Sequence, residues 1–109
     1  MTIEEILKNE HIELINDIGQ DRVFHDVYIG DLLSCVMANG KDESLWITVQ
    51  RHINVIAVAE LVGFQAIVFV ESAIPDQQTI EKANELSIPL LKTSLTAFEL
   101  SKYLILEGM

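Results

Sequence analysis

The chain has one cysteine, few aromatic residues and few basic residues, and each shortage excludes something. Cys35 is the only cysteine among 109 residues, so no disulfide can form within the chain, and a cytoplasmic compartment is expected. Aromatic residues make up 6% of the sequence while 50% of it is hydrophobic, so the core must be mainly aliphatic. This length and composition predict a single folded domain over residues 1–109.

Basic residues are too few and too scattered for a polyanion-binding surface. Seven lysines and arginines stand against seventeen acids, which gives a formal net charge of −10. Because nucleic acids and anionic lipids are bound by clustered cations, we expect neither a nucleic-acid nor a membrane partner. The N-terminal MTIEEILKNE is acidic and amphipathic, unlike a signal peptide, and no apolar run approaches the ~20 residues needed to span a bilayer.

Patterns that carry catalysis or bind metals are also missing. The glycines match neither GxxxxGK[ST] nor GxGxxG, and GxSxG is absent. His11, His25 and His52 lie far apart and have no ligand-type partner at helical spacing. Cys35, beside Val36 on a predicted helix, is expected to be a buried hydrophobe rather than a reactive thiol. We therefore expect no enzyme activity, no metal site and no cofactor.

The first half of the chain alternates short helices and strands. Thr2 and Glu5 have the spacing of a capping box, and Asn39-Gly40 predicts a left-handed helix stop. The expected elements are a helix over about residues 3–9, a short edge strand at Ile12 to Ile15, a turn at Gly19, a strand at Val27–Ile29 and a helix over about residues 32–39.

The second half has the rhythm of a parallel βαβ arrangement. Leu45–Val49, Ala66–Val70 and Ile88–Leu91 are short apolar runs with helical patterns between them. Runs that are apolar on both faces are typical of inner strands in a parallel sheet that helices cover on both sides. The predicted fold class is therefore α/β, a three-layer α/β/α domain with a mostly parallel sheet and right-handed crossovers.

Single residues place the ends of the remaining elements. Asp76 is expected to cap the helix before the last strand, and Pro89 suggests that this strand lies at an edge of the sheet. Thr93 or Ser94 is expected to cap a closing helix that runs to about Leu106.

The helix expected over Ile53–Val62 has almost no polar face. Only Asn54 and Glu60 among its residues are polar. Either the monomer encloses this helix, or its outer face meets another subunit. We favour the second alternative, a homodimer, because soluble monomers avoid large exposed apolar patches.

A ligand site is suggested by position alone. In open parallel sheets, ligands bind beyond the carboxyl ends of the strands, near helix N-termini. Arg51 could hold a phosphate or carboxylate, whereas Glu71 would repel a phosphate or pair with Arg51 itself. The alternative is that Gln50, Ser72 and Thr93 are ordinary caps and turns. Apart from Gly30-Asp31, which follows the first strand, the candidate ligand-binding residues are Gln50, Arg51, Glu71, Ser72 and Thr93.

The segments VYIGDLLSCVMANGKDESLWITVQRHINVIAVAEL and AIVFVESAIPDQQTIEKANELSIPLLKT resemble the DRTGG domain family. Where the family has Asp-Arg, this chain has Gln50-Arg51, and where it has Thr-Gly-Gly, this chain has Val70-Glu71-Ser72. The family accompanies CBS domains in regulatory pyrophosphatases and is related in fold to the N-terminal domain of HPr kinase/phosphorylase. The resemblance implies an α/β/α domain, frequently dimeric, with a regulatory role and no established catalysis of its own.

These observations lead to two functional hypotheses. The first is a non-catalytic, homodimeric regulatory or interaction domain in cytoplasmic metabolic or redox signalling, which docks on a protein partner. The second is a small-molecule sensor that binds an adenine nucleotide or another phosphate-bearing ligand at the five candidate residues. Thermal-shift screening with nucleotides, repeated on Arg51→Ala, would separate the two.

Overall fold

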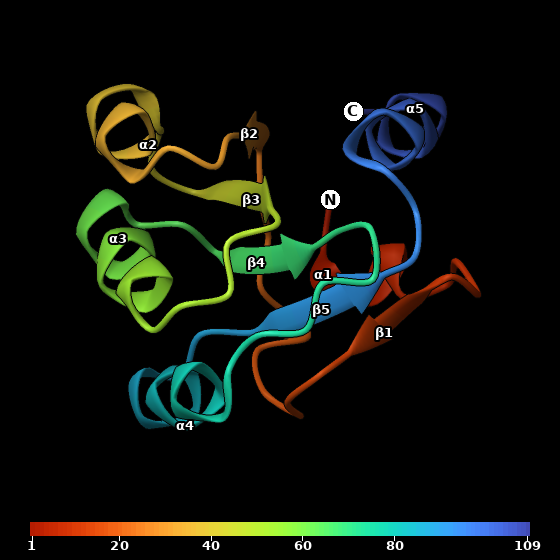
Figure 1. Ribbon diagram of the computed structural model, residues 1–109. Helices are drawn as coiled ribbons and strands as arrows, with labels where there is room; N and C mark the ends of the chain where they lie inside the picture. Colours follow the sequence, from red (N-terminus) through yellow and green to blue (C-terminus); the bar gives the residue numbers. More distant parts are fainter.

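The three apolar runs of the second half lie side by side as parallel strands. In the computed structural model, which describes residues 1–109, they form β3 (Ser44–Thr48), β4 (Ala66–Phe69) and β5 (Leu90–Thr93). At one edge, β2 (Asp26–Ile29) pairs with β3 in parallel, and at the other edge β1 (Ile12–Leu14) pairs with β5 antiparallel. The strand order is β1-β5-β4-β3-β2, which confirms the predicted mostly parallel sheet (Figure 1).

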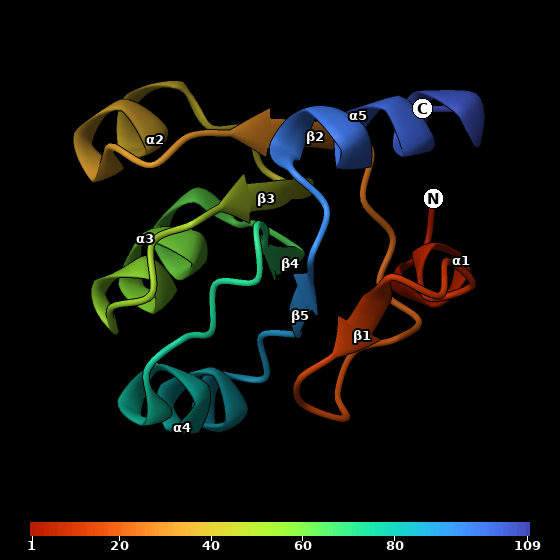
Figure 2. The ribbon, with the colours of Figure 1, turned by 45° about the vertical axis from the view of Figure 1, so that its right-hand side comes forward.

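Helices cover both faces of this sheet, as expected for three layers. The connections between successive parallel strands contain α2 (Leu33–Asn39), α3 (Asn54–Val62) and α4 (Gln77–Leu86), all on one face (Figure 1). The other face is covered by α1 (Ile3–Ile6) and α5 (Ala97–Leu106), which lie on the right in Figure 2. None of the helices combines the length and the apolar character needed to span a bilayer.

The sheet separates two hydrophobic cores, each with 12 buried residues. Side chains along a strand alternate between faces, so Leu45 and Ile47 of β3 enter the core under α1 and α5. Trp46, between them, enters the core under α2, α3 and α4, and its indole N–H donates to the Gly30 carbonyl oxygen at 2.9 Å. Every residue of β3 is buried, which explains why its sequence is apolar at successive positions.

The last strand is not an edge strand, contrary to the suggestion from Pro89. β1 covers the outer side of β5, with Ile12 opposite Thr93 and Leu14 opposite Leu91. Pro89 lies just before β5, where its missing N–H removes no ladder bond, and its carbonyl accepts from the Ile67 N–H at 3.1 Å.

Helix ends agree with the sequence in part. The capping box of Thr2 and Glu5 is confirmed, although α1 ends at Ile6, earlier than expected. Asp76 stands at the N-cap of α4, but its side chain makes no capping hydrogen bond.

Two other predicted helix ends are wrong. Thr96, rather than Thr93 or Ser94, caps α5 and forms a capping box with Glu99. Gly40 is not left-handed, since its φ is −65°. Glycine fits there for a steric reason: an added Cβ would lie 2.7 Å from both Phe64 Cζ and the Val36 carbonyl oxygen.

The apolar helix α3 buries one face in the monomer and exposes the other, which carries Asn54, Ala57, Glu60 and Leu61. The monomer therefore encloses this helix only in part. Val55 and Val58 are buried in the core between α3 and the sheet, and α2 and α4 flank the helix (Figure 1). Among the large apolar residues of α3, Leu61 is the exposed one, at 73%. The apolar character of α3 therefore gives no support for self-association through this helix. Cys35 is exposed on α2, so the prediction that it is buried is wrong.

Candidate functional site

The connections that leave β4 and β5 turn to opposite faces of the sheet. The chain passes from β4 to α4 on one face and from β5 to α5 on the other (Figure 1). Such a switch opens a crevice beyond the carboxyl ends of the two strands, where open α/β sheets commonly bind ligands. A cavity of about 320 Å³ lies here, lined by Glu10, His11, Glu13, Ser72, Ile74, Lys92, Thr93 and Ser94.

Two left-handed residues shape one wall of this cavity. Glu71 and Ser72 follow β4 with φ of 56° and 61°, a conformation that costs a non-glycine residue about 1–2 kcal/mol. Their N–H groups donate to the carbonyl oxygens of Leu95 at 2.8 Å and Thr93 at 3.0 Å. These hydrogen bonds tie the segment after β4 to the segment after β5 and help hold Ser72 in the cavity wall.

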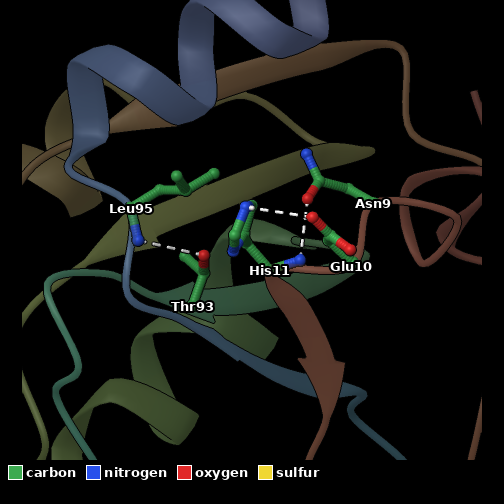
Figure 3. Close-up of polar contacts among 5 residues, drawn as sticks. All are labelled: Asn9, Glu10, His11, Thr93 and Leu95. Carbon is green, nitrogen blue, oxygen red and sulfur yellow. Dashed lines mark hydrogen bonds and ion pairs between the residues drawn. The ribbon is translucent and has the colours of Figure 1, made fainter.

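Thr93 provides a buried hydroxyl among the lining residues. The residue is 4% exposed, and its Oγ1 accepts a hydrogen bond from the Leu95 N–H at 3.1 Å (Figure 3). No protein acceptor takes the hydroxyl hydrogen, so the group keeps a donor to offer to a bound molecule.

Charged residues of both signs also line the cavity. Lys92 Nζ lies 3.5 Å from Glu13 Oε2, across the antiparallel pair of β5 and β1. His11 Nε2 lies 3.6 Å from Glu10 Oε1 (Figure 3). The backbone N–H of His11 donates a hydrogen bond to Asn9 Oδ1 at 2.8 Å. Exposed ion pairs of this kind contribute about 0–1 kcal/mol each, so they can rearrange around a ligand.

A second cavity of about 550 Å³ adjoins the first and shares Glu10 and His11 with it. Tyr103 of α5 lines this second cavity. Partial burial, and then the nearby negative charge of Glu107, raise the pKa of the Tyr103 hydroxyl above its ordinary value. Tyr103 therefore stays a neutral hydroxyl that can donate a hydrogen bond.

Gln50 lies at the carboxyl end of β3 and does not line the first cavity. Its side-chain amide donates to the Asp31 carbonyl oxygen at 2.7 Å. The Asp31 carboxylate in turn accepts from Thr48 Oγ1 at 2.8 Å and from the Val49 N–H at 2.9 Å. These contacts join the loops after β2 and β3. They agree with the alternative interpretation, in which Gln50 is an ordinary turn residue.

Arg51 is exposed, and neither its side chain nor that of Glu71 takes part in any of the ion pairs of the molecule. The Arg51–Glu71 pair that the sequence suggested is therefore not formed. The Arg51 carbonyl oxygen accepts from Thr79 Oγ1 at 2.7 Å and from the Asp76 N–H at 3.1 Å, which fixes the start of α4.

The structure thus brings two of the five predicted residues, Ser72 and Thr93, to one cavity. Sequence reasoning did not find Glu10, Glu13 and Lys92, and His11 was considered only as a metal ligand. They reach the site because β1 pairs with β5, a contact between distant parts of the chain. The opposite charges of Glu13 and Lys92 on facing strand positions are the one signal that could have suggested this pairing.

No protein-family model matches the sequence, and no curated protein matches it. A solved structure does match in fold, with a TM-score of 0.66 and 16% sequence identity. It is the crystal structure of the CBS and DRTGG domains of the regulatory region of Clostridium perfringens pyrophosphatase, complexed with the activator diadenosine tetraphosphate. The match covers 93% of this chain and 44% of that one, so the chain spans less than half of that regulatory region. The likeness shows a shared α/β fold.

Proposed function

We propose that the chain is a non-catalytic regulatory domain of the DRTGG type that senses a small molecule. The observation that carries this proposal is the cavity at the carboxyl ends of β4 and β5, with the buried Thr93 among its lining residues. The resemblance of two long segments to the DRTGG family and the likeness in fold to a pyrophosphatase regulatory region support it. That region was crystallised with a dinucleotide activator, so adenine nucleotides are the first ligands to test.

A ligand bound in the cavity would change the position of α5. Thr93 lines the cavity, and α5 begins at Ala97, a few residues later. The intervening Leu95 receives the hydrogen bond from Glu71 and packs against the core under α5. A molecule that contacts Ser72 and Thr93 would therefore favour one position of this segment, and with it one position of the helix.

Thermal-shift measurements with AMP, ADP, ATP and diadenosine tetraphosphate test the proposal. A ligand at 100 times its dissociation constant stabilises the folded state by about 2.7 kcal/mol. A nucleotide that binds in the cavity should give a shift that Thr93→Val abolishes and that Thr79→Val, which removes another buried hydroxyl outside the cavity, leaves intact. A shift that survives Thr93→Val but disappears in Arg51→Ala would move the site to the end of β3.

We propose as a second function that two copies associate through the face made by α5 and the edge strand β2. A groove of about 240 Å³ runs between them, lined in part by Val27, Ile29, Leu104, Ile105 and Met109. Ile29 is 51% exposed and Ile105 68% exposed, and Phe98 and Leu106 add further exposed apolar surface on α5. Exposed apolar surface of this kind marks interaction sites in soluble proteins.

Sedimentation of surface variants tests this association. We expect a dimer for the wild-type chain and a monomer for Ile105→Glu or Ile29→Lys. Leu61→Glu is the matched control, because Leu61 is a similarly exposed apolar residue on α3. A wild-type monomer at high concentration, or a dimer that only Leu61→Glu breaks, would contradict the proposed face.

A role in cytoplasmic metabolic or redox signalling, and a protein partner within it, stay predictions from the family resemblance. Capture of interacting proteins from native cytoplasm, with Ile105→Glu as the comparison, would identify such a partner.

A further inference from the structure

The charge of the cavity argues for a particular class of ligand, an inference that rests on the proposed sensor function. The carboxylates of Glu10 and Glu13 outnumber the ammonium of Lys92 in the lining. The whole chain carries a formal charge of −10. A ligand that carries several phosphates would therefore meet a repulsive field on approach and inside the cavity.

The same groups fit a molecule that carries one charge of each sign. Lys92 can hold a carboxylate through its ammonium, and Ser94, another lining residue, can add a hydroxyl donor. Glu13 lies opposite Lys92 on β1, and Glu10 lies in the turn before that strand, so both can accept hydrogen bonds from an ammonium. We infer that the cavity binds a small zwitterion, an amino acid.

The ion pair already present shows how such a ligand would enter. Lys92 and Glu13 are separated by 3.5 Å, and both side chains are substantially exposed. Because an exposed pair of this kind contributes about 0–1 kcal/mol, a zwitterion can replace it at little cost and pair with both partners. The ammonium of Lys92 then faces the ligand carboxylate, and the carboxylate of Glu13 faces the ligand ammonium.

The size and polarity of the cavity restrict the amino acid further. The volume of about 320 Å³ is at the small end of the range of ligand pockets, about 300–1,000 Å³. Ile74 is the one hydrophobic residue in the lining, whereas Ser72 and Ser94 add hydroxyls. A short or polar amino-acid side chain is therefore favoured over a large apolar one.

Isothermal titration calorimetry on the full chain tests the inference with serine, glutamate and leucine. Serine is compared with two analogues that each lack one of its charges: ethanolamine lacks the carboxylate, and glycerate lacks the ammonium. We expect serine or glutamate to bind more tightly than leucine, and each analogue to bind at least about tenfold more weakly than serine. Ethanolamine or glycerate binding as well as serine would overturn the inference.

Variants separate this site from nonspecific charge effects. Lys92→Met and Glu13→Gln should each weaken amino-acid binding at least about tenfold. Lys82→Met is the matched control, since Lys82 pairs with Glu85 at 3.5 Å outside the cavity and its loss should leave binding unchanged. Circular dichroism of each variant checks that it is folded, and an unfolded Lys92→Met would be replaced by Lys92→Gln.

The outcomes also separate the inference from the proposed function. Nucleotide binding that Thr93→Val abolishes, without any amino-acid binding, overturns the zwitterion and keeps the sensor. Absence of a response to both ligand classes overturns both. Amino-acid binding that Lys92→Met and Glu13→Gln leave unchanged would place the ligand elsewhere and overturn the inference.

Discussion

The backbone N–H of Glu71 donates a hydrogen bond of 2.8 Å to the carbonyl oxygen of Leu95. Glu71 reaches this position with a φ of 56°, and Ser72 follows with 61°. In the resemblance inferred from the sequence, these positions correspond to the two glycines of the DRTGG motif, the residues that adopt positive φ without steric cost. Glu71 and Ser72 adopt the left-handed conformation without being glycines, and their hydrogen bonds join the two segments that border the cavity.

We predict that Glu71→Gly leaves the free energy of unfolding unchanged or raises it by up to about 1.5 kcal/mol. Relief of the left-handed strain, about 1–2 kcal/mol, is offset in part by the greater freedom of glycine in the unfolded chain, about 0.5–1 kcal/mol. Glu60→Gly in α3 is the control and should lose about 1 kcal/mol in urea denaturation. A loss at Glu71 as large as that at Glu60 would argue against the strain.

Asp31 is predicted to stabilise the junction of the loops after β2 and β3. Its carboxylate accepts from the Thr48 hydroxyl, which is 1% exposed, and from the Val49 N–H. Asp31→Ala should therefore lower the free energy of unfolding by about 1–3 kcal/mol, because a buried hydroxyl loses its partner. Asp21→Ala, at an exposed position, should change stability by less than about 0.5 kcal/mol, and equal effects would refute the role of Asp31.

The capping box of α5 predicts a pH dependence. Hydrogen bonds from the Thr96 backbone and hydroxyl lower the pKa of Glu99 below its ordinary 4.5. Because the folded-state pKa is the lower one, the stabilisation is fully present above the unfolded pKa and is lost as the pH falls through the folded value. Melting temperatures of Glu99→Gln between neutral pH and pH 3 should fall less steeply than those of the wild type. Thr96→Ala keeps the backbone N–H, which is the larger cause, and should show only part of this flattening; an unchanged slope in Glu99→Gln would contradict the linkage.

The burial of one face of α3 is tested by two neighbouring positions of that helix. Val55 is fully buried, so Val55→Lys places an unpaired charge in the core and should cost more than about 3 kcal/mol or prevent folding. Ala57 is exposed on the same helix, and Ala57→Lys should change stability by less than about 0.5 kcal/mol. Urea denaturation measures both, and a tolerated Val55→Lys would show that the helix face is open to solvent.

The fold class could be predicted because strands whose two faces are both buried have consecutive apolar residues in the sequence. Leu45, Trp46 and Ile47 are consecutive apolar residues, and the structure places them alternately in two cores. The position of α3 could not be predicted in the same way. Its apolar sides are covered by α2 and α4, and a sequence window contains no information about such lateral neighbours.

Only those residues of the candidate site that lie at the ends of the parallel strands could be predicted from the sequence. Ser72 and Thr93 follow from the rule that ligands bind at the carboxyl ends of parallel strands. Glu10 and Glu13 line the cavity because Ile12 pairs with Thr93, a contact between residues from nearly opposite ends of the chain. The cap of α5 was misplaced because the apolar run suggested a last strand that ends at Leu91, whereas β5 continues to Thr93.

The division of the interior by the sheet gives each layer its own optical reporter. Trp46, the one tryptophan, is fully buried on the side of α2, α3 and α4. Tyr103 packs against the opposite core. Indole fluorescence therefore follows one layer, and the near-ultraviolet signal of a Tyr28→Phe chain adds the phenol of the other. Coincident unfolding transitions would mean that the two layers unfold together as one cooperative unit. Separate transitions would mean that each layer unfolds independently.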